Sequence, residues 1–161
     1  SLELNSFSKA FNMAGWRGML IAARDIIDTV LKVKSNVDSG MFLPVQAGAI
    51  EALRAPQDWH DERNGVYRER REWAYRIFDR LRFRYSRDQV GMFIWAKAPD
   101  PMASLEEFLD DVLERAAVFI TPGFIFGTNG RRYARCSLCV PQERFQTALS
   151  RLDSIGDSLV F

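Results

Sequence analysis

A short segment near the start of the sequence contains several side chains that can act on a phosphorylated carbonyl compound. Within SFSKAFNMAGWRG lie two hydroxyls, Ser6 and Ser8, one amine, Lys9, and one guanidinium, Arg17. Hydroxyl and guanidinium groups bind phosphate oxygens through charge-assisted hydrogen bonds, and a neutral lysine amine attacks an aldehyde to form a Schiff base. The segment would therefore suit a phosphorylated ligand with a reactive carbonyl. The alternative interpretation is a polar loop with a surface lysine.

Two motifs, in this segment and far downstream, resemble those of one enzyme family. SFSKAFNMAGWRG is similar to the lysine signature of the fold-type I pyridoxal phosphate enzymes, specifically the class I and II aminotransferases: SxSK, a short apolar stretch, then GxR. Residues 121–139, TPGFIFGTNGRRYARCSLC, resemble the family's PGxxFG, glycine turn and RxS strand. Both motifs occur in the family's order, and the resemblance extends over essentially the whole chain.

The resemblance implies a role for each matching residue. Lys9 corresponds to the lysine that binds the cofactor, pyridoxal 5'-phosphate, and then moves a proton at the substrate α-carbon. Ser6 and Arg17 correspond to ligands of the cofactor phosphate, and Ser8 is a weaker candidate for the same role. Arg135 corresponds to the arginine that binds the substrate α-carboxylate in a bidentate pair. No metal ion is expected.

A third segment, KSNVDSG at 34–40, bears on the substrate. It resembles the diaminopimelate-type and the aspartate or alanine-type branches of the family, in which this stretch lies near the active site at the subunit boundary. An ordinary turn at the end of a helix is the alternative. The sequence has no clear counterpart of the arginine that binds the distal carboxylate in the aspartate enzymes. Lys32 or Lys34 can take that place, and the identity of the amino acid substrate stays open.

The elements that must position these residues follow from the spacing of apolar side chains. Strands alternate with helices, which predicts an α/β fold, or an α+β layer, with a small, mostly antiparallel sheet covered by helices. Gly15 is expected to allow a tight turn, and a helix over 25–34 is expected to bury Ile26, Leu31 and Val33. The predicted strands are 2–4, 17–23 (a short buried strand), 91–97, 118–121 and 133–140, and the other predicted helices are 44–53, 56–81, 105–116 and 141–152.

Strand alternation separates Arg135 from its neighbours. Along 133–140, Arg135 and Ser137 share one face while Cys136 and Leu138 lie on the other, so the arginine can face a cleft as its neighbours enter the core. Residues three apart on a strand point to opposite faces. Cys136 and Cys139 are therefore expected to be buried structural residues rather than a redox or zinc pair. The single histidine, His60, is expected to be a surface or capping residue.

Composition and charge exclude several classes of protein. The 161 residues have a net charge of +1, and neither a signal peptide nor a long uncharged apolar run is visible, which favours a cytoplasmic protein without membrane partners. Residues 62–87 contain nine arginines and four acidic residues. Because the acids recur at helical spacing, a solvated helix face is preferred to a nucleic-acid site.

These expectations combine into one functional hypothesis. The chain resembles the C-terminal portion of an aminotransferase, with a remnant of the large cofactor domain in 1–34 and the helical connection and small domain in 35–161. The parent enzyme is expected to be a homodimer that transfers an amino group between an amino acid and a 2-oxo acid, and the isolated portion is expected to be inactive. The alternative is the non-catalytic effector domain of a regulator that binds pyridoxal phosphate or an amino acid.

Overall fold

The structure, a computed structural model, describes residues 2–156 and divides into two compact units, Ser1–His60 and Asp61–Phe161. The long helix α4 (Gln57–Arg80) begins in the first unit and continues into the second. Residues 1 and 157–161, at the ends of the two predicted domains, lie outside the described part of the chain.

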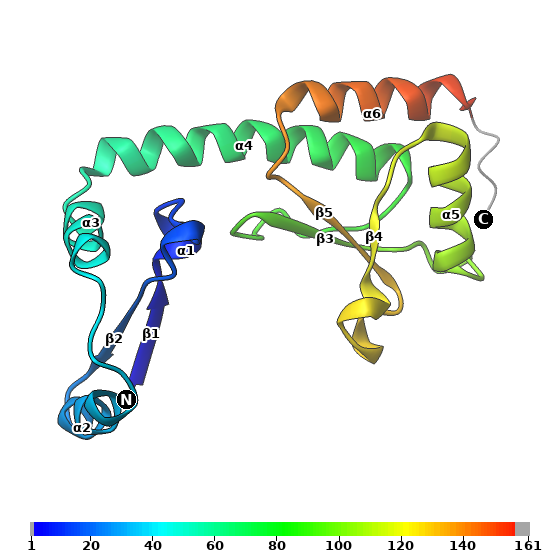
Figure 1. Ribbon diagram of the computed structural model, residues 1–161. Helices are drawn as coiled ribbons and strands as arrows, with labels where there is room; N and C mark the ends of the chain where they lie inside the picture. Colours follow the sequence, from blue (N-terminus) through cyan, green and yellow to red (C-terminus); the bar gives the residue numbers. More distant parts are fainter. Residues whose placement is uncertain (1, 157–161) are drawn as a thin grey trace. The chain divides into compact units, whose positions relative to one another are not determined.

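The first unit is built on a hairpin of two strands with an elaborated turn. β1 and β2 pair antiparallel, and their register places Leu4 opposite Ile21. Figure 1 shows α1 and α2 at opposite ends of this hairpin, because α1 follows β1 and α2 follows β2. The elements of the unit before α4 are β1 (Leu2–Ser6), α1 (Phe7–Ala10), η1 (Ala14–Trp16), β2 (Met19–Ala23), α2 (Ile27–Val37) and α3 (Leu43–Leu53).

Most apolar side chains of the first unit are exposed. Ile26, Leu31 and Val33 are exposed by 43%, 54% and 59%, so the prediction that they are buried is wrong. β2 exists as a strand but is not buried either, since its residues are exposed or half-buried. The apolar spacing identified the correct element types. Burial additionally requires a covering layer, and residues 2–60 provide none over these faces.

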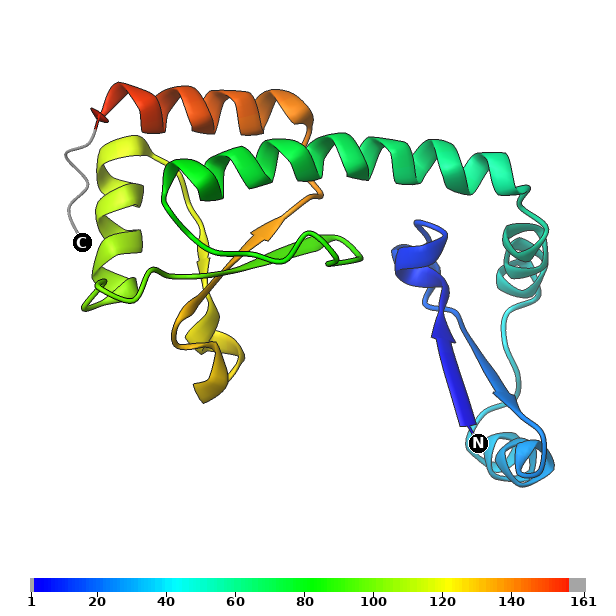
Figure 2. The same ribbon diagram turned by 180° about the vertical axis from the view of Figure 1, so that it is seen from behind.

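The second unit contains a three-stranded antiparallel sheet, which agrees with the predicted fold class. The strand order is β3-β5-β4, and β5 pairs with both neighbours. Figures 1 and 2 show α4 and α6 together on one side of this sheet. The elements that follow α4 are β3 (Phe93–Lys97), α5 (Leu105–Ala116), β4 (Thr121–Pro122), η2 (Gly123–Phe126), η3 (Thr128–Gly130), β5 (Tyr133–Ser137) and α6 (Gln142–Ser154).

The hydrophobic core of this unit lies between the helices and one face of the sheet. Ile94 and Ala96 on β3, and Ala134 on β5, are completely buried. They alternate with the half-buried Trp95 and Arg135 on the opposite face. Burial of apolar area is the main stabilising contribution, and it fixes which face of the sheet is left open. The helices add Ala74, Tyr75, Ile77, Phe78, Leu105, Phe108, Leu109, Val112, Phe145 and Leu152 to the core.

The end of α4 is fixed by a Schellman motif that turns the chain back toward the sheet. The Phe83 amide donates to the Phe78 carbonyl at 2.9 Å, and the Arg82 amide donates to the Asp79 carbonyl at 3.0 Å. Arg82 is left-handed, with φ 59°. The Phe78 and Phe83 rings lie 5.8 Å apart, which supplies the hydrophobic contact of this motif. The chain can then continue to Arg84, which pairs with Lys97 on β3.

Candidate functional site

The turn between β1 and β2 contains the predicted cofactor-binding residues. The strand register pairs Ser6 with Met19, and the Phe7 amide donates to the Gly18 carbonyl at 3.3 Å. Ser6 is the last residue of β1, and Arg17 lies two residues before β2. Both residues are therefore held at the same end of the hairpin, and the other two candidates lie on the turn between them.

The short helix α1 arranges Ser6, Ser8 and Lys9. Ser6 is the N-cap of this helix, and its Oγ accepts the Ser8 amide at 3.2 Å. Because the hydroxyl acts only as an acceptor in this bond, its own proton is available to an anion. Lys9 is exposed, and its Nζ forms no ion pair with an acidic side chain of the described residues. The amine is thus accessible for covalent chemistry.

The turn achieves its shape differently from the prediction. Arg17 is left-handed, with φ 54° and ψ 36°, and so is Asn12, with φ 54°. Gly15 does not have a positive φ, and a Cβ at this position would meet nothing within 4 Å. Gly15 lies in the 3-10 turn η1, so a tight turn forms there as expected, but its backbone does not require glycine. The Arg17 side chain is anchored by a hydrogen bond from Nη1 to the Ala14 carbonyl at 3.2 Å.

The donor set of this turn fits pyridoxal phosphate in its chemistry. Arg17 offers a guanidinium and Ser6 a hydroxyl to a phosphate dianion, and Lys9 offers a primary amine to an aldehyde. Arg17 uses Nη1 for the Ala14 carbonyl, so its other N–H groups are left for a ligand. Ser8 is half-buried and contributes its amide to the Ser6 cap.

Arg135 lies in the second unit, on the open face of the sheet. The register pairs Arg135 with Trp95 on one side and with Thr121 on the other. Cross-strand partners share a face, so these side chains are neighbours. Leu138 is completely buried, whereas Ser137 is half-buried. The arginine thus occupies the face that strand alternation predicted for it.

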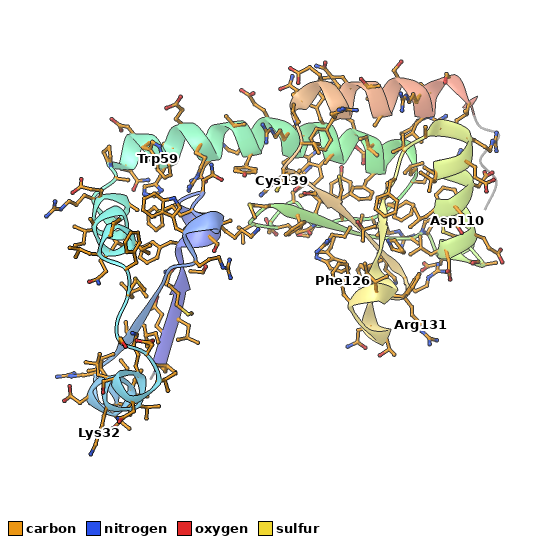
Figure 3. The ribbon with its side chains drawn as sticks, viewed as in Figure 1. Lys32, Trp59, Asp110, Phe126, Arg131 and Cys139 are labelled. Carbon is orange, nitrogen blue, oxygen red and sulfur yellow. The ribbon has the colours of Figure 1, made fainter. Side chains whose placement is uncertain are left out.

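Two aromatic rings contact the Arg135 guanidinium. Its Cζ lies 4.2 Å from the centroid of the Phe93 ring and 4.1 Å from that of the Phe126 ring. Figure 3 labels Phe126, which comes from the 3-10 turn η2 beside the sheet. Arg135 Nε is buried and has no hydrogen-bond partner. Among the described residues no carboxylate pairs with this guanidinium, so its charge is uncompensated.

Sequence reasoning missed the two rings around Arg135. Neither Phe93 nor Phe126 was among the predicted site residues. One signal was present, because Phe93 and Trp95 alternate with buried residues and thus share a face of β3. The pairing of that face with Arg135 depends on the strand register, which a single sequence does not specify.

The 34–40 segment forms the end of α2 and a compact turn. Lys34 Nζ lies 2.7 Å from Asp38 Oδ1, and the same oxygen accepts the Gly40 amide at 3.0 Å. The hydrogen bond from Lys34, together with that from Gly40, lowers the pKa of Asp38. Lys34 is therefore engaged by its own turn. Lys32 is exposed and projects from α2, as labelled in Figure 3.

The two cysteines have different environments. Cys136 on β5 is half-buried, and the burial of its thiol raises the thiol pKa to about 12. Cys139 is exposed, so the expectation that both are buried is wrong for this residue. The strand ends at Ser137, which releases the later residue from the sheet. Within residues 2–156 no group of three His, Cys, Asp or Glu side chains is placed to bind a metal ion.

His60 is half-buried in an aromatic cluster. Its ring lies edge-on to Trp59 at 4.9 Å and to Phe11 at 5.7 Å. The predicted surface or capping role is therefore incomplete, since the ring also packs.

The arginine-rich helix α4 uses several of its charges within the fold. Beyond the end of the helix, Arg87 pairs with Glu72 of α4 at 3.2 Å. This ion pair, together with hydrogen bonds from α4 arginines to main-chain carbonyls, supports the structural interpretation of the charged face. In the part of the chain that the structure describes, no helix combines the length and apolar character that crossing a membrane requires. The carbonyls that accept hydrogen bonds from α4 arginines belong to Leu138 (from Arg70), Gln89 and Gly91 (from Arg71), and Leu152 and Gly156 (from Arg80).

Comparison with known proteins identifies the family of the chain. Residues 1–152 match the family of class I and II aminotransferases. The chain is 40% identical over 161 residues to an LL-diaminopimelate aminotransferase of Moorella thermoacetica, covering 99% of the chain and 41% of that protein. It is 39% identical over 156 residues to the LL-diaminopimelate aminotransferase of Nitratidesulfovibrio vulgaris, covering 96% of the chain and 40% of that protein.

A solved structure gives the same result for the fold. Substrate-bound BacF of Bacillus subtilis superposes with a TM-score of 0.82 at 32% identity, covering 96% of the chain and 40% of that protein. The chain belongs to the class I and II aminotransferases, a fold-type I family that depends on pyridoxal phosphate. It spans about two fifths of the length of the curated relatives that it matches.

Proposed function

We propose that the full-length protein is an aminotransferase that moves an amino group between an amino acid and a 2-oxo acid by a ping-pong mechanism. The observation that carries this proposal is the closed turn between β1 and β2, which holds an accessible amine, Lys9, between Ser6 and Arg17. Family membership over residues 1–152 supports it independently.

The turn residues are proposed to bind the cofactor and to move a proton. Pyridoxal phosphate, when bound, supplies an electron-accepting ring that stabilises negative charge on the substrate α-carbon. Lys9 would hold the cofactor through its amine, and the same amine, when neutral, would transfer a proton at the substrate α-carbon. Arg17 and the Ser6 hydroxyl donate to the phosphate, and Ser8 is the weaker candidate for that role.

Arg135 is proposed to bind the substrate α-carboxylate. Its guanidinium has no carboxylate partner among the described residues and lies on the open face of the sheet. A planar guanidinium donates two parallel hydrogen bonds to a carboxylate, which fixes the orientation of the substrate as well as its position.

LL-diaminopimelate is the first substrate to test, since it is named in both relatives described above. Aspartate and alanine are the alternatives that the 34–40 segment leaves open. Asp38 engages Lys34. Lys32 is therefore a better candidate than Lys34 for a contact with the distal polar group of the substrate.

The 161-residue chain alone is proposed to be inactive, and the full-length protein is proposed to be a cytoplasmic homodimer. Support comes from the first unit, where Leu4, Met19 and Leu43 are exposed by 59%, 47% and 72%. Such surfaces are normally covered by further protein. Light scattering of the full-length protein tests the dimer, and an assay of the chain alone tests its inactivity.

The decisive experiment compares two lysine variants of the full-length protein. Lys9→Ala should abolish covalent attachment of pyridoxal phosphate, measured by mass spectrometry after borohydride reduction, and it should abolish transamination. Lys32→Ala removes another exposed amine of the same unit and should leave attachment intact. Transamination that persists in Lys9→Ala would overturn the proposal. Covalent attachment to Lys9 without turnover of any amino acid would instead favour a non-catalytic effector domain.

A further inference from the structure

Two aromatic rings from different elements contact the guanidinium of Arg135. Phe93 belongs to β3 and Phe126 to η2, while Arg135 itself belongs to β5. The two ring centroids lie 4.2 and 4.1 Å from Cζ. Three separate elements therefore meet at one side chain, on the face of the sheet opposite the hydrophobic core.

Aromatic contacts differ from an ion pair in what they leave accessible. A carboxylate partner would occupy the N–H groups of the guanidinium and neutralise its charge. Ring faces attract the cation through their quadrupole and leave the N–H groups in the guanidinium plane unoccupied. The Nε atom of Arg135 is buried and has no hydrogen-bond partner. The two terminal nitrogens are thus the groups left to receive an incoming anion.

The Phe126 ring packs against Trp95, whose main chain is itself fixed. The Trp95 ring lies edge-on to Phe126 at 5.3 Å. The main chain of Trp95 is fixed by the Gln89 side chain, whose Oε1 accepts the Trp95 amide at 2.7 Å and whose Nε2 donates to the Trp95 carbonyl at 2.9 Å. The side-chain amide of Gln89 thus makes the two hydrogen bonds that a neighbouring strand would make at the outer edge of β3.

The backbone of η2 is also confined. Gly123 opens η2 and lies against Gly130 of η3, and a Cβ on Gly123 would come within 2.5 Å of the Gly130 and Tyr133 carbonyl oxygens. Only glycine permits this approach. Phe126, three residues later, is thus placed by a turn that has little room to shift.

We propose that Phe93 and Phe126 are positioning residues that fix the plane of the Arg135 guanidinium for the substrate carboxylate. This inference rests on the proposed function of Arg135. The rings do not touch the reacting atoms. They restrict rotation about the side-chain bonds of Arg135 before the substrate binds. Less conformational entropy is therefore lost on binding, and the carboxylate meets a preorganised pair of donors.

The test compares three phenylalanine variants of the full-length protein. Phe126→Leu and Phe93→Leu remove one ring each and keep an apolar side chain. Phe124→Leu is the matched control, because Phe124 lies in the same turn η2 and has no ring contact with Arg135 among the described residues. A cation–π contact of about 0.5–2 kcal/mol corresponds to a rise in substrate KM of about twofold to thirtyfold, with kcat changed less.

Two further measurements separate positioning from a general loss of structure. The affinity for an unreactive carboxylate analogue of the substrate should fall by the same factor as KM rises, whereas its carboxamide counterpart should bind equally to all variants. In the full-length protein, the Arg135 Nε–Hε resonance should be shifted by the ring currents, and Phe126→Leu should move it toward the resonances of exposed arginines.

The outcomes distinguish this inference from the proposed function. If Arg135→Leu leaves KM unchanged, the carboxylate role fails, and the positioning role fails with it. If Arg135→Leu raises KM while the two ring variants match Phe124→Leu, only the positioning role is refuted. An unshifted Nε–Hε resonance in the unsubstituted full-length protein would also refute it, because the ring contacts would then be absent in solution.

Discussion

Two neighbouring alanines at the end of α5 should respond to glycine in opposite directions. Ala117 is left-handed, with φ 52° and ψ 41°, and its amide donates to the Leu113 carbonyl at 2.9 Å. A left-handed alanine costs roughly 1–2 kcal/mol, and glycine removes this cost while losing roughly 0.5–1 kcal/mol in unfolded-state entropy. Ala117→Gly should therefore raise the free energy of unfolding of the second unit by about 0.5–1 kcal/mol.

Ala116 provides the matched control one residue earlier. It is the last residue of α5 and is 4% exposed. Glycine here loses about 1 kcal/mol of helix propensity and about 0.8 kcal/mol from the buried methyl group. Ala116→Gly should therefore lower the free energy of unfolding by about 2 kcal/mol.

Hydrogen exchange at the Leu138 amide measures both effects. This residue is completely buried, and its amide donates to the Met92 carbonyl at 2.9 Å. Under conditions in which exchange follows unfolding, Ala117→Gly should slow it about threefold and Ala116→Gly should accelerate it about thirtyfold. Faster exchange in Ala117→Gly would refute the reasoning, since the entropy lost with glycine would then exceed the cost of the left-handed alanine.

Three other predictions follow from the environments of single side chains. Cys139 should be alkylated rapidly in the native protein, whereas Cys136, whose thiol pKa burial raises to about 12, should react about a hundredfold more slowly until unfolding, as measured by mass spectrometry. Burial, with the hydrogen bond to Asp79, raises the pKa of Tyr85 to about 12, so the stability due to the neutral phenol should be complete below about pH 10 and lost as pH rises toward 12. Asp79→Asn should lower that pKa in a tyrosinate absorbance titration. Arg135→Lys in the full-length protein keeps the charge and loses the planar fork, so kcat/KM for the amino acid should fall about tenfold to a hundredfold in steady-state assays.

The second unit was largely predictable because its helices and strands carry strong periodic patterns. The helix predicted over 56–81 is α4, Gln57–Arg80, and Ala74, Ile77 and Phe78 on its apolar face are buried. Position along β5 likewise predicted the face of Arg135. Local periodicity determines these features, since a side chain's direction depends only on its place in the helix or strand.

The first unit and the surroundings of Arg135 were less predictable, for two physical reasons. Apolar side chains such as Leu31 have the spacing of a buried face, yet spacing does not supply a partner surface. Phe93 and Phe126 meet Arg135 only through strand pairing and the approach of η2, which depend on contacts between distant parts of the chain. The turn around Gly15 also differs from expectation, because Asn12 and Arg17, rather than the glycine, have the left-handed backbone conformation.

The unequal use of arginine and lysine connects the fold to the proposed chemistry. The chain has 18 arginines and four lysines. Arginines such as Arg80 and Arg132 donate to several main-chain carbonyls at once, which a planar group with five N–H donors does well and an ammonium does less well. A permanently charged guanidinium also suits Arg135 beside its two rings. The step proposed for Lys9 requires the opposite property, an amine that can lose its proton and become a nucleophile. Lysine at this position is thus a chemical requirement that arginine, protonated throughout the physiological range, cannot meet.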